Sequence, residues 1–420
     1  MRHLLYLASR SAWNRRLTLS LTLTAIALSV ALLLGVDRVR RDARESFAQS
    51  VSGTDLVVGA RTSPVQLMLY SVFRIGEATS SMQWESYRKL AAHPLVKWAI
   101  PMSLGDSHHG YSVVGTTADY FEHFRYGGGE ALAFTKGKRF DGVFEAVVGA
   151  DVAERLGYRV GDRITLNHGG GEMSHAEHGD KPFAVTGILA RTGTPVDRSV
   201  HVALEAIEAI HLDWQAGAPI PGVSIPAEHV RKFDLTPKAI TAVLVGLKSR
   251  AAVFRMQRYV NELPGEALVG VMPGVALAQL WQIVGMAERV LLAVSAMVVA
   301  VGLAGLVAVV LAGLNERRRE IAILRSVGAR PRDIFLLLMT EAVGITVIGA
   351  LAGVVLLGVL TLALAPFAAA RYGLIIEPAF IAGGEGVLLA AVVAVGVLAS
   401  LVPGYRAYRL SLADGLTPRL

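Results

Sequence analysis

The sequence predicts an α-helical membrane protein with four transmembrane helices and a large extracytoplasmic mixed α/β domain inserted between helices 1 and 2. Two observations lead to this fold class. The 420-residue chain has 53% hydrophobic residues, 18% charged residues and a mean hydropathy of +0.48, which is too apolar for an ordinary soluble globule. It contains four long apolar runs, and a segment of mixed composition, residues 38–284, separates the first run from the second.

Each apolar run is long enough to cross a bilayer, whose hydrocarbon core of about 30 Å requires about 20 residues of helix. The first run resembles the hydrophobic part of a signal peptide in position. However, Val36-Asp37-Arg38 follows it in place of a small-residue cleavage site, which indicates a retained anchor. We therefore expect transmembrane helices at 17–37, 285–314, 334–366 and 386–405.

The arginines of the connecting segments predict the orientation. Residues 1–16 carry four arginines and no acidic residue, 315–333 carry six arginines against three acidic residues, and 406–420 carry three against one. Positively charged connections stay in the cytoplasm. We expect these three segments, an amphipathic N-terminal helix, a coupling helix and a tail, to be cytoplasmic. The nearly neutral 38–284 and a short outer loop, 367–385, would lie on the other, extracytoplasmic side of the membrane.

The arginines that follow the first span and the net charge of the chain both bear on the predicted orientation. Arg38, Arg40, Arg41 and Arg44 follow the first span directly and run against this orientation. Long domains are translocated largely regardless of such charges, so the orientation is kept. The formal net charge of +7 then serves as a topology signal, and no nucleic-acid partner is needed to explain it.

The outer segment has the alternating pattern of a folded α/β domain. Short apolar runs bounded by turn residues predict strands, and apolar residues at helical spacing predict helices. We expect a loop in the polar, glycine-rich stretch 167–180. The expected strands are 146–149, 163–166, 183–189 and 242–246, and the expected helices are 81–92, 151–156, 204–211 and 251–262.

The connection after the second span carries the most specific motif, Glu316-Arg-Arg-Arg-Glu-Ile-Ala-Ile-Leu-Arg-Ser-Val-Gly-Ala-Arg-Pro-Arg-Asp-Ile-Phe335. Its apolar residues recur at helical spacing beside a polar side, so it predicts an amphipathic helix. Gly328 is placed to end that helix, Pro331 to begin the next, and Asp333 lies in the first turn. From the residues alone, the helix either binds anionic lipid headgroups or docks a cytosolic partner.

This motif resembles the segment after the second span in ABC transporter permeases of the MacB/FtsX/LolC type. Other pieces of the chain resemble that family in the same order: the basic start 7–16, the outer segments 147–162 and 192–198, and the ending 402–416. The resemblance covers most of the chain.

The resemblance implies a permease subunit of a bacterial inner membrane, with its outer domain in the periplasm. It would work as a homodimer together with separate cytosolic ATP-binding subunits. Movement driven by nucleotide would pass through the spans to the outer domain, for export or extraction of a lipoprotein, a hydrophobic compound or a metal-related cargo. No phosphate-binding loop motif is present, so we expect ATP and Mg²⁺ on the partner and no catalysis by this chain alone. The residues expected to couple to the ATPase are Glu316, Arg317, Arg318, Arg319, Glu320, Leu324, Arg325 and Gly328.

Two alternatives remain from the sequence. One is an FtsX-like regulator that activates an outside protein and transports nothing, and the other is a metal-responsive membrane sensor. A receptor would need a cytoplasmic output domain, and the expected cytoplasmic segments are short. Besides the ATP-binding subunit, the partners considered are a periplasmic protein and membrane lipid.

Glu341 is the one acidic residue deep within an apolar run. An ionisable group in lipid is costly and should face protein or water. Because it lies about two helical turns beyond Asp333, we expect a structural role at the cytoplasmic end in preference to a proton relay.

Ten of the 11 histidines lie in the outer segment. His168, His175 and His178 are close in sequence, and His108 and His109 form a pair. Imidazoles suit zinc, and the chain has no cysteine, so thiolate ligands and disulfides are excluded. One interpretation is a zinc site in this His-rich loop, and the other is a solvated polar loop. No metalloprotease motif or carboxylate pair indicates a catalytic site.

The apolar stretch 63–73 lies close to the first span in sequence. It is expected to form part of the core. If exposed, it would instead rest on the membrane surface or shield an acyl chain.

Overall fold

The computed structural model describes residues 16–169, 178–215, 218–220, 225–316, 318–372 and 383–409. Within these residues the chain forms two compact units. One holds residues 16–42, 285–368 and 383–409, and the other holds 43–284 and 369–372. We describe each unit by itself.

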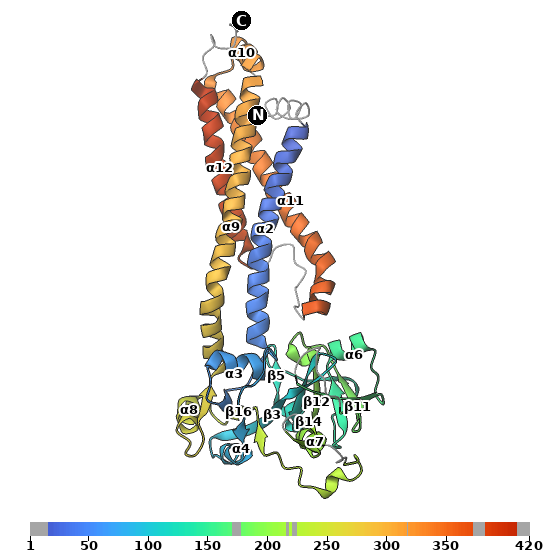
Figure 1. Ribbon diagram of the computed structural model, residues 1–420. Helices are drawn as coiled ribbons and strands as arrows, with labels where there is room; N and C mark the ends of the chain where they lie inside the picture. The colour runs from blue at the N-terminus through green and yellow to red at the C-terminus, as the bar shows by residue number, and fades with distance from the viewer. Residues whose placement is uncertain are drawn as a thin grey trace. The chain divides into compact units, whose positions relative to one another are not determined.

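The first unit consists of long helices that run side by side (Figure 1). Four of the described helices are long and apolar enough to cross a membrane, as the sequence predicted. All four are longer than the expected spans, because each helix continues beyond the expected span at one or both ends. The helices are α2 (Arg16–Gln49), α9 (Pro273–Glu316), α11 (Pro331–Tyr372) and α12 (Glu385–Arg409), with a short α10 (Arg318–Ser326) between α9 and α11.

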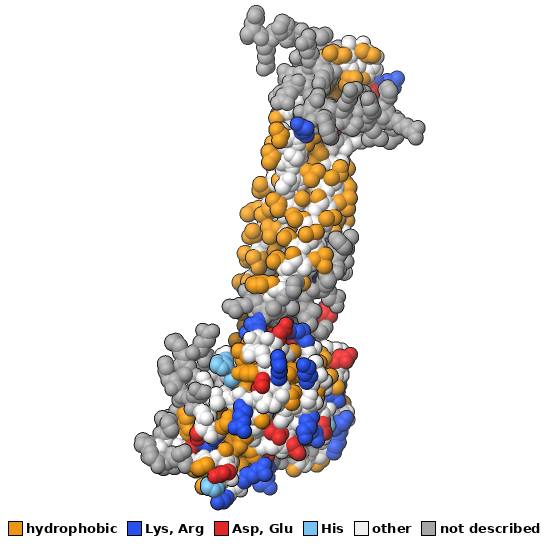
Figure 2. Space-filling view, turned by 90° about the vertical axis from the view of Figure 1, so that its right-hand side faces the viewer, with side chains coloured by type: hydrophobic (Ala, Val, Ile, Leu, Met, Phe, Trp, Pro, Cys, Tyr) orange, Lys and Arg blue, Asp and Glu red, His pale blue; other side chains and the backbone are white. Residues whose placement is uncertain are grey.

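Small residues let these helices approach one another closely, as expected for helices that pack in lipid. A side chain at Gly353 of α11 would meet the Ala27 carbonyl oxygen of α2 at 2.7 Å. Likewise, a side chain at Gly396 of α12 would meet Thr346 of α11. Hydrophobic side chains cover the visible outer face of these helices, whereas charged side chains gather on the other unit (Figure 2). The helical unit therefore has the surface of a membrane-embedded bundle.

The second unit is built on a mixed sheet in the order β17-β1-β16-β3-β4-β12-β8-β11-β7, with β10 beside β3 and β9 beside β11. Two pairs, β12–β4 and β11–β8, are parallel, and the other pairs of this sheet are antiparallel. Its strands are β1 (Leu56–Ala60), β3 (Val96–His108), β4 (Tyr111–Thr116), β7 (Phe134–Gly137), β8 (Glu145–Val148), β9 (Arg163–Ile164), β10 (Asn167–His168), β11 (Phe183–Leu189), β12 (Ser199–Ala203), β16 (Ala242–Leu247) and β17 (Leu268–Val271).

Helices and short turns complete this unit. Three small two-stranded sheets pair β2 (Met82–Gln83) with β15 (Ala239–Ile240), β5 (Arg125–Tyr126) with β6 (Glu130–Ala131), and β13 (Trp214–Gln215) with β14 (Ala218–Pro219). The helices are α3 (Pro64–Ser71), α4 (Trp84–Ala91), α5 (Asp119–His123), α6 (Ala150–Leu156), α7 (Leu204–His211) and α8 (Val253–Asn261), and three 3₁₀ turns are η1 (Pro195–Arg198), η2 (Val230–Lys232) and η3 (Arg250–Ala252).

Apolar residues cover both faces of the central strands. In β1, Val57 belongs to one hydrophobic cluster, whereas its neighbours Leu56 and Val58 belong to another. Because successive side chains of a strand point to opposite faces, these clusters are the two cores on either side of the sheet. Strands buried on both faces read as continuous apolar runs, which is why the run that forms β16 was recognisable in the sequence.

Several expected elements of this unit are present, and others differ. The strands expected at 146–149, 183–189 and 242–246 correspond to β8, β11 and β16, and α7 covers the expected 204–211. The strand expected at 163–166 shortens to β9, and the helix expected from 81 begins only at Trp84, after β2. The loop expected at 167–180 begins instead with β10, because the backbone there pairs with β3. Residues 170–177 lie outside the described part of the chain.

The stretch 63–73 contains α3 and the residues on either side of it. Ser63 caps this helix by accepting a hydrogen bond from the Gln66 N–H, and Pro64 occupies the first turn, where its missing N–H is tolerated. Leu67 and Met68 are 0% and 2% exposed. The core interpretation is therefore correct, and the membrane-resting or acyl-shielding role, which required exposure, is not supported.

Candidate functional site

The coupling motif forms α10 and the start of α11, with the boundaries that its turn residues predicted. The Ala329 N–H donates to the Leu324 carbonyl at 3.0 Å, and Gly328 has a φ of +106°, which a side chain would strain. The helix α11 then begins at Pro331. Asp333 accepts a hydrogen bond from the Arg330 N–H at 2.8 Å and so caps the N-terminus of α11.

The two sides of α10 have different environments. Ile321 is 7% exposed and packs into the core of the helical unit, whereas Ile323 and Val327 are 54% and 83% exposed. The apolar residues therefore do not form the single stripe that the sequence suggested: Ile321 points inward and Val327 points outward. Leu324 and Arg325 are half-buried between these two sides.

Other residues of the motif are described only in part. Glu316 ends α9, and Arg318, Arg319 and Glu320 lie in α10, but their side chains fall outside the description, as does Arg317 altogether. Glu341 lies in α11 and is half-buried. Its neighbour Ala342 is fully buried in the helical core, so Glu341 stands at the edge of the packed face.

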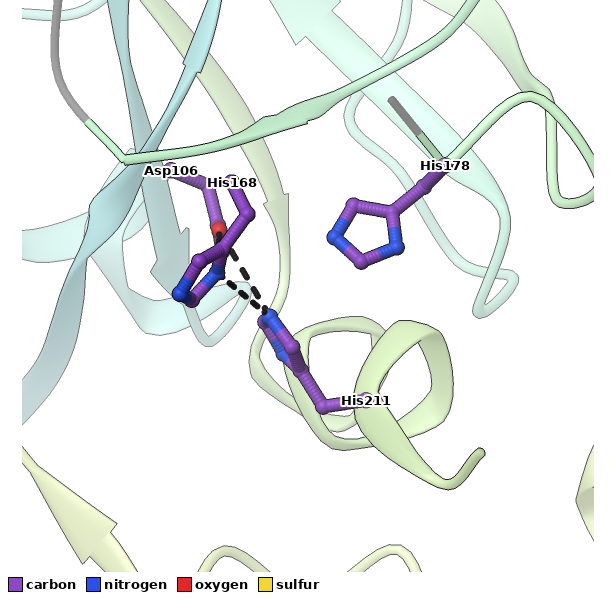
Figure 3. Close-up of side chains that lie close together, drawn as sticks. All are labelled: Asp106, His168, His178 and His211. Atoms are coloured by element: carbon purple, nitrogen blue, oxygen red, sulfur yellow. Dashed lines mark hydrogen bonds and ion pairs between the residues drawn. The ribbon is translucent and has the colours of Figure 1, made fainter. Parts of the chain in front are cut away.

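A second constellation lies in the α/β unit, where Asp106, His168, His178 and His211 come together (Figure 3). Asp106 lies in β3 and His168 in β10, and the antiparallel pairing places them directly opposite each other. A shift of register in β3 between Leu104 and Ser107 accompanies this pairing and is of the kind that re-aims side chains. His211 is the last residue of α7, and His178 follows the undescribed residues 170–177.

The ligand-type atoms of these four side chains all lie within 4.8 Å of one another. His168 Nδ1 is 3.2 Å from Asp106 Oδ1 and 3.0 Å from His211 Nε2. His211 Nε2 is 3.7 Å from the same Asp106 oxygen. The ring of His178 approaches from the opposite side, with its centroid 5.0 Å from that of His211. Figure 3 shows the three rings directed toward a common centre.

Neighbouring groups orient these side chains. The Nδ1–H of His211 donates to the Ile207 carbonyl at 2.7 Å, because a carbonyl oxygen can only accept, and this leaves Nε2 with its lone pair toward the cluster. The His178 backbone N–H donates to the Leu166 carbonyl at 2.8 Å. The ring of Trp214 packs on His178 with the centroids 4.1 Å apart.

A buried ion pair holds the chain after His178 against the chain after α7. Lys181 is fully buried and donates to both carboxylate oxygens of Asp213, at 2.8 and 2.9 Å, and to Asp180 at 2.7 Å. Asp213 also accepts the Ile225 N–H. A charge that is buried needs such partners, so this pair secures the segment that carries His178.

The electrostatic environment differs between the histidines. Burial, together with the neighbouring His211, lowers the pKa of His178 to about 4, so this ring is neutral at neutral pH. The hydrogen bond with Asp106 raises the pKa of His168. His178 is 0% exposed, and neither of its ring nitrogens has a hydrogen-bond partner among the described residues.

The structure brings together only part of the histidine set that the sequence suggested. His168 and His178 are in the cluster, and His175 lies outside the described residues. His108 lies apart from it, with its nitrogens hydrogen-bonded to the Thr165 carbonyl and the Tyr158 hydroxyl. His109 is exposed and has a φ of +47°.

Sequence reasoning did not identify Asp106 and His211 as members of the cluster. The helix 204–211 was recognised, and its last residue is the histidine that completes the site. Asp106 lies two positions before the His108–His109 pair and was not among the expected ligands. The only signal in the sequence was that aspartate and histidine are metal-ligating residue types. No local pattern indicates which strand edge faces the end of α7.

Comparisons with known proteins address the whole chain. Residues 19–263 match the family described as MacB-like periplasmic core domain, and residues 292–412 match the FtsX-like permease C-terminal family. The pyoverdine export ATP-binding/permease protein PvdT of Pseudomonas fluorescens is 25% identical over 83% of this chain and 50% of its own length. The macrolide export ATP-binding/permease protein MacB of Nitrobacter winogradskyi is 23% identical over 94% of this chain and 57% of its own length.

Two further similarities are shorter. The lipoprotein-releasing system transmembrane protein LolC of Neisseria meningitidis is 25% identical over 51% of this chain and 47% of its own length. The periplasmic region of MacB from Actinobacillus actinomycetemcomitans aligns with a TM-score of 0.34 and 9% identity, over 55% of this chain and 94% of that structure. The chain thus spans about half the length of the relatives it matches.

Proposed function

The chain belongs to the family of ABC transporter permeases with a MacB-like periplasmic core domain and an FtsX-like permease C-terminal region, and we propose that it couples ATP hydrolysis by a separate ATP-binding subunit to movement of its periplasmic domain. In this proposal the chain itself does not hydrolyse ATP. The nucleotide and its Mg²⁺ are bound by the partner, and the permease works as a homodimer in the inner membrane with its N- and C-termini in the cytoplasm.

The observation that carries this proposal is the two-sided environment of α10. Its inner side, through Ile321, packs with residues of the helical unit, so a force on α10 is passed to the membrane helices. Its outer side presents Ile323 and Val327, two apolar side chains one helical turn apart, to the surroundings. Exposed apolar residues beside arginines are suited to a protein partner with an apolar groove and acidic rim.

The cargo is proposed only as a class. The names of the relatives specify export of pyoverdine, export of macrolides and release of lipoproteins. For this chain we propose export or extraction of a lipoprotein, a hydrophobic compound or a metal-related cargo, together with a periplasmic protein partner and contact with membrane lipid.

Co-purification tests the coupling. The solubilised permease, carrying a non-histidine affinity tag, is expected to retain a stoichiometric ATPase from its native membrane. Ile323→Asp with Val327→Asp, or charge reversal at Arg317, Arg318 and Arg319, should release that ATPase. Ile323→Leu with Val327→Ile keeps the apolar surface and should retain it. Purification of the permease without any ATPase, in every detergent and nanodisc tried, would contradict the proposal.

A second candidate function is a regulator or metal-responsive sensor that transports nothing. The cluster of Asp106, His168, His178 and His211 in the α/β unit favours this second function, because coupling through α10 does not require such a cluster. The two functions differ in one measurement: a transporter moves its cargo in an ATP-dependent way in proteoliposomes or spheroplasts, whereas a regulator changes the activity of an outside protein without net movement of any compound.

A further inference from the structure

We propose that the periplasmic domain binds one zinc ion through His168, His178, His211 and Asp106. This site is independent of the proposed ATPase coupling, since it involves only side chains of the α/β unit. It departs from the set expected from the sequence by using Asp106 and His211 in place of His108 and His109, and His175 of that set lies outside the described residues.

The spacing of the ligand atoms fits a tetrahedral ion. Zinc bonds of about 2.0–2.1 Å place the atoms of a tetrahedron about 3.3 Å apart. The separations among His168 Nδ1, His211 Nε2 and Asp106 Oδ1 are 3.0, 3.2 and 3.7 Å. The His178 ligand atom lies within 4.8 Å of these three atoms. Compared with a tetrahedral edge of about 3.3 Å, this limit requires a movement of at most about 1.5 Å in the His178 side chain.

Hydrogen bonds alone do not give a partner to every ring nitrogen in this cluster. His211 uses its Nδ1–H on the Ile207 carbonyl, so its Nε2 is an acceptor. The Nδ1 of His168 lies within hydrogen-bonding distance of both that Nε2 and Asp106 and has one proton to share between them. The buried nitrogens of His178 have no hydrogen-bond partner among the described residues. A cation at the centre would accept lone pairs from all three rings at once.

The surroundings have the features of a supported metal site. When the second ring nitrogen of a ligating histidine donates its N–H to a carbonyl, the tautomer of that histidine is fixed. The Ile207 carbonyl accepts this hydrogen bond from His211. Trp214 covers His178 with an apolar ring, and the Lys181–Asp213 pair secures the backbone on either side of the site. The side chains of His168 and His211 are 38% and 26% exposed, so an ion can reach the site from solvent.

The donor set selects the class of metal. Three imidazoles and one carboxylate suit zinc, whereas magnesium and calcium prefer sites made entirely of oxygen ligands. The ligands come from β3, β10, α7 and the chain after residue 177. A bound zinc ion would therefore crosslink four segments that are separated from one another in the sequence.

Zinc titration of the full-length permease tests the site in the absence of any ATPase. The protein is purified in detergent with a non-histidine tag, stripped with a chelator and titrated with Zn²⁺ by calorimetry and by competition with a fluorescent zinc indicator. We expect one zinc per chain. His178→Ala and His211→Ala should each weaken binding by at least about 10–100-fold, the loss produced even by removing an indirect partner. Mg²⁺ and Ca²⁺ should not compete.

The exposed His109 provides a matched control. His109→Asn removes an imidazole from the same unit, and asparagine tolerates the positive φ at this position. It should leave zinc affinity unchanged. Unchanged affinity in both His178→Ala and His211→Ala, or loss of binding in His109→Asn alone or in His175→Ala alone, would overturn the proposed ligand set.

Spectroscopy on the unsubstituted protein keeps the test valid if a variant fails to fold. Co²⁺ in place of Zn²⁺ should give the intense visible absorption of a tetrahedral ion, and X-ray absorption should give nitrogen and oxygen ligands at about 2.0–2.2 Å. A six-coordinate cobalt spectrum, or no stoichiometric metal in the chelator-stripped and reloaded protein, would contradict the proposal.

Discussion

Arg38 and Glu385 form a buried, bidentate salt bridge that joins α2 to α12. The Arg38 Nε–H donates to Glu385 Oε1 at 2.8 Å, and its Nη2 donates to Oε2 at 2.7 Å. Arg41 donates to the same carboxylate at 2.9 Å, while Asp37 pairs with Arg40 and Arg41. Three of the arginines that ran against the expected orientation are therefore paired with carboxylates inside the helical unit.

Removal of the carboxylate at position 385 should destabilise the helical unit strongly. Glu385→Gln leaves the Arg38 guanidinium, 3% exposed, without its buried anion, and the loss of one member of a buried pair costs about 3–5 kcal/mol. The midpoint of thermal unfolding of the solubilised protein, followed by intrinsic fluorescence, should fall. The double variant Arg38→Met/Glu385→Leu should recover much of the loss, since no charge is left buried. An unchanged midpoint in Glu385→Gln would show that the pair is not buried in the protein.

Close packing between α2 and α11 predicts that Gly353→Ala is destabilising. The added methyl group would lie 2.7 Å from the Ala27 carbonyl oxygen and 2.8 Å from the Val30 Cβ, and overpacking of this kind costs about 1–3 kcal/mol. Gly305→Ala in α9 is the control, because its methyl group meets nothing within 4 Å and alanine favours helix. Equal thermal stability of the two variants would contradict the close approach.

Zinc should stabilise the α/β unit. A ligand that binds only the folded state at 100 times its Kd adds about 2.7 kcal/mol to the free energy of unfolding. Hydrogen exchange of the full-length protein should report this as slower exchange of the His178 amide, which donates to Leu166, and of the end of α7. Added Mg²⁺ should have no such effect, and His211→Ala should remove the effect of zinc. Equal exchange with and without zinc at saturation would count against a crosslinking ion.

Acid should weaken the same unit through His201, which lies away from the proposed zinc ligands. Burial lowers the pKa of His201 to about 3, and the charge of Arg74 contributes in the same direction. The unfolded chain binds this proton with a pKa of about 6.5, so stability is complete above pH 6.5 and falls as the pH drops toward 3. The contribution is about 2 kcal/mol between pH 6.5 and pH 5.

His201→Leu provides the comparison for this pH dependence. Leucine has about the same volume and does not titrate, so the variant should lose less stability between pH 6.5 and pH 5 than the parent protein does. Protection of the β12 amides in hydrogen exchange at the two pH values measures the difference. Identical pH dependence in the two proteins would mean that His201 can take up its proton in the folded state.

Local patterns predicted the membrane helices and many elements of the α/β unit. The apolar runs identify the four spans because the length and apolar composition of each run are enough to predict a helix that crosses the bilayer. Gly328 marks the end of α10 and Pro331 the start of α11, because caps depend on residues only a few positions apart. The apolar run of β16 was recognisable for the same reason. The direction of individual side chains was less predictable: Val327 has the helical spacing of a buried residue and is 83% exposed.

The family, the fold class and the two turn signals of the coupling segment thus follow from the sequence by itself, since periodicity, capping and motif spacing are properties of neighbouring residues. Tertiary structure decided which distant residues meet. Asp106 and His168 are 62 positions apart and face each other through the β3–β10 register, and His211 reaches them from the end of α7. Arg38 and Glu385 are separated by 347 positions. Such pairs depend on strand register and on the packing of helices, and no local pattern contains that information.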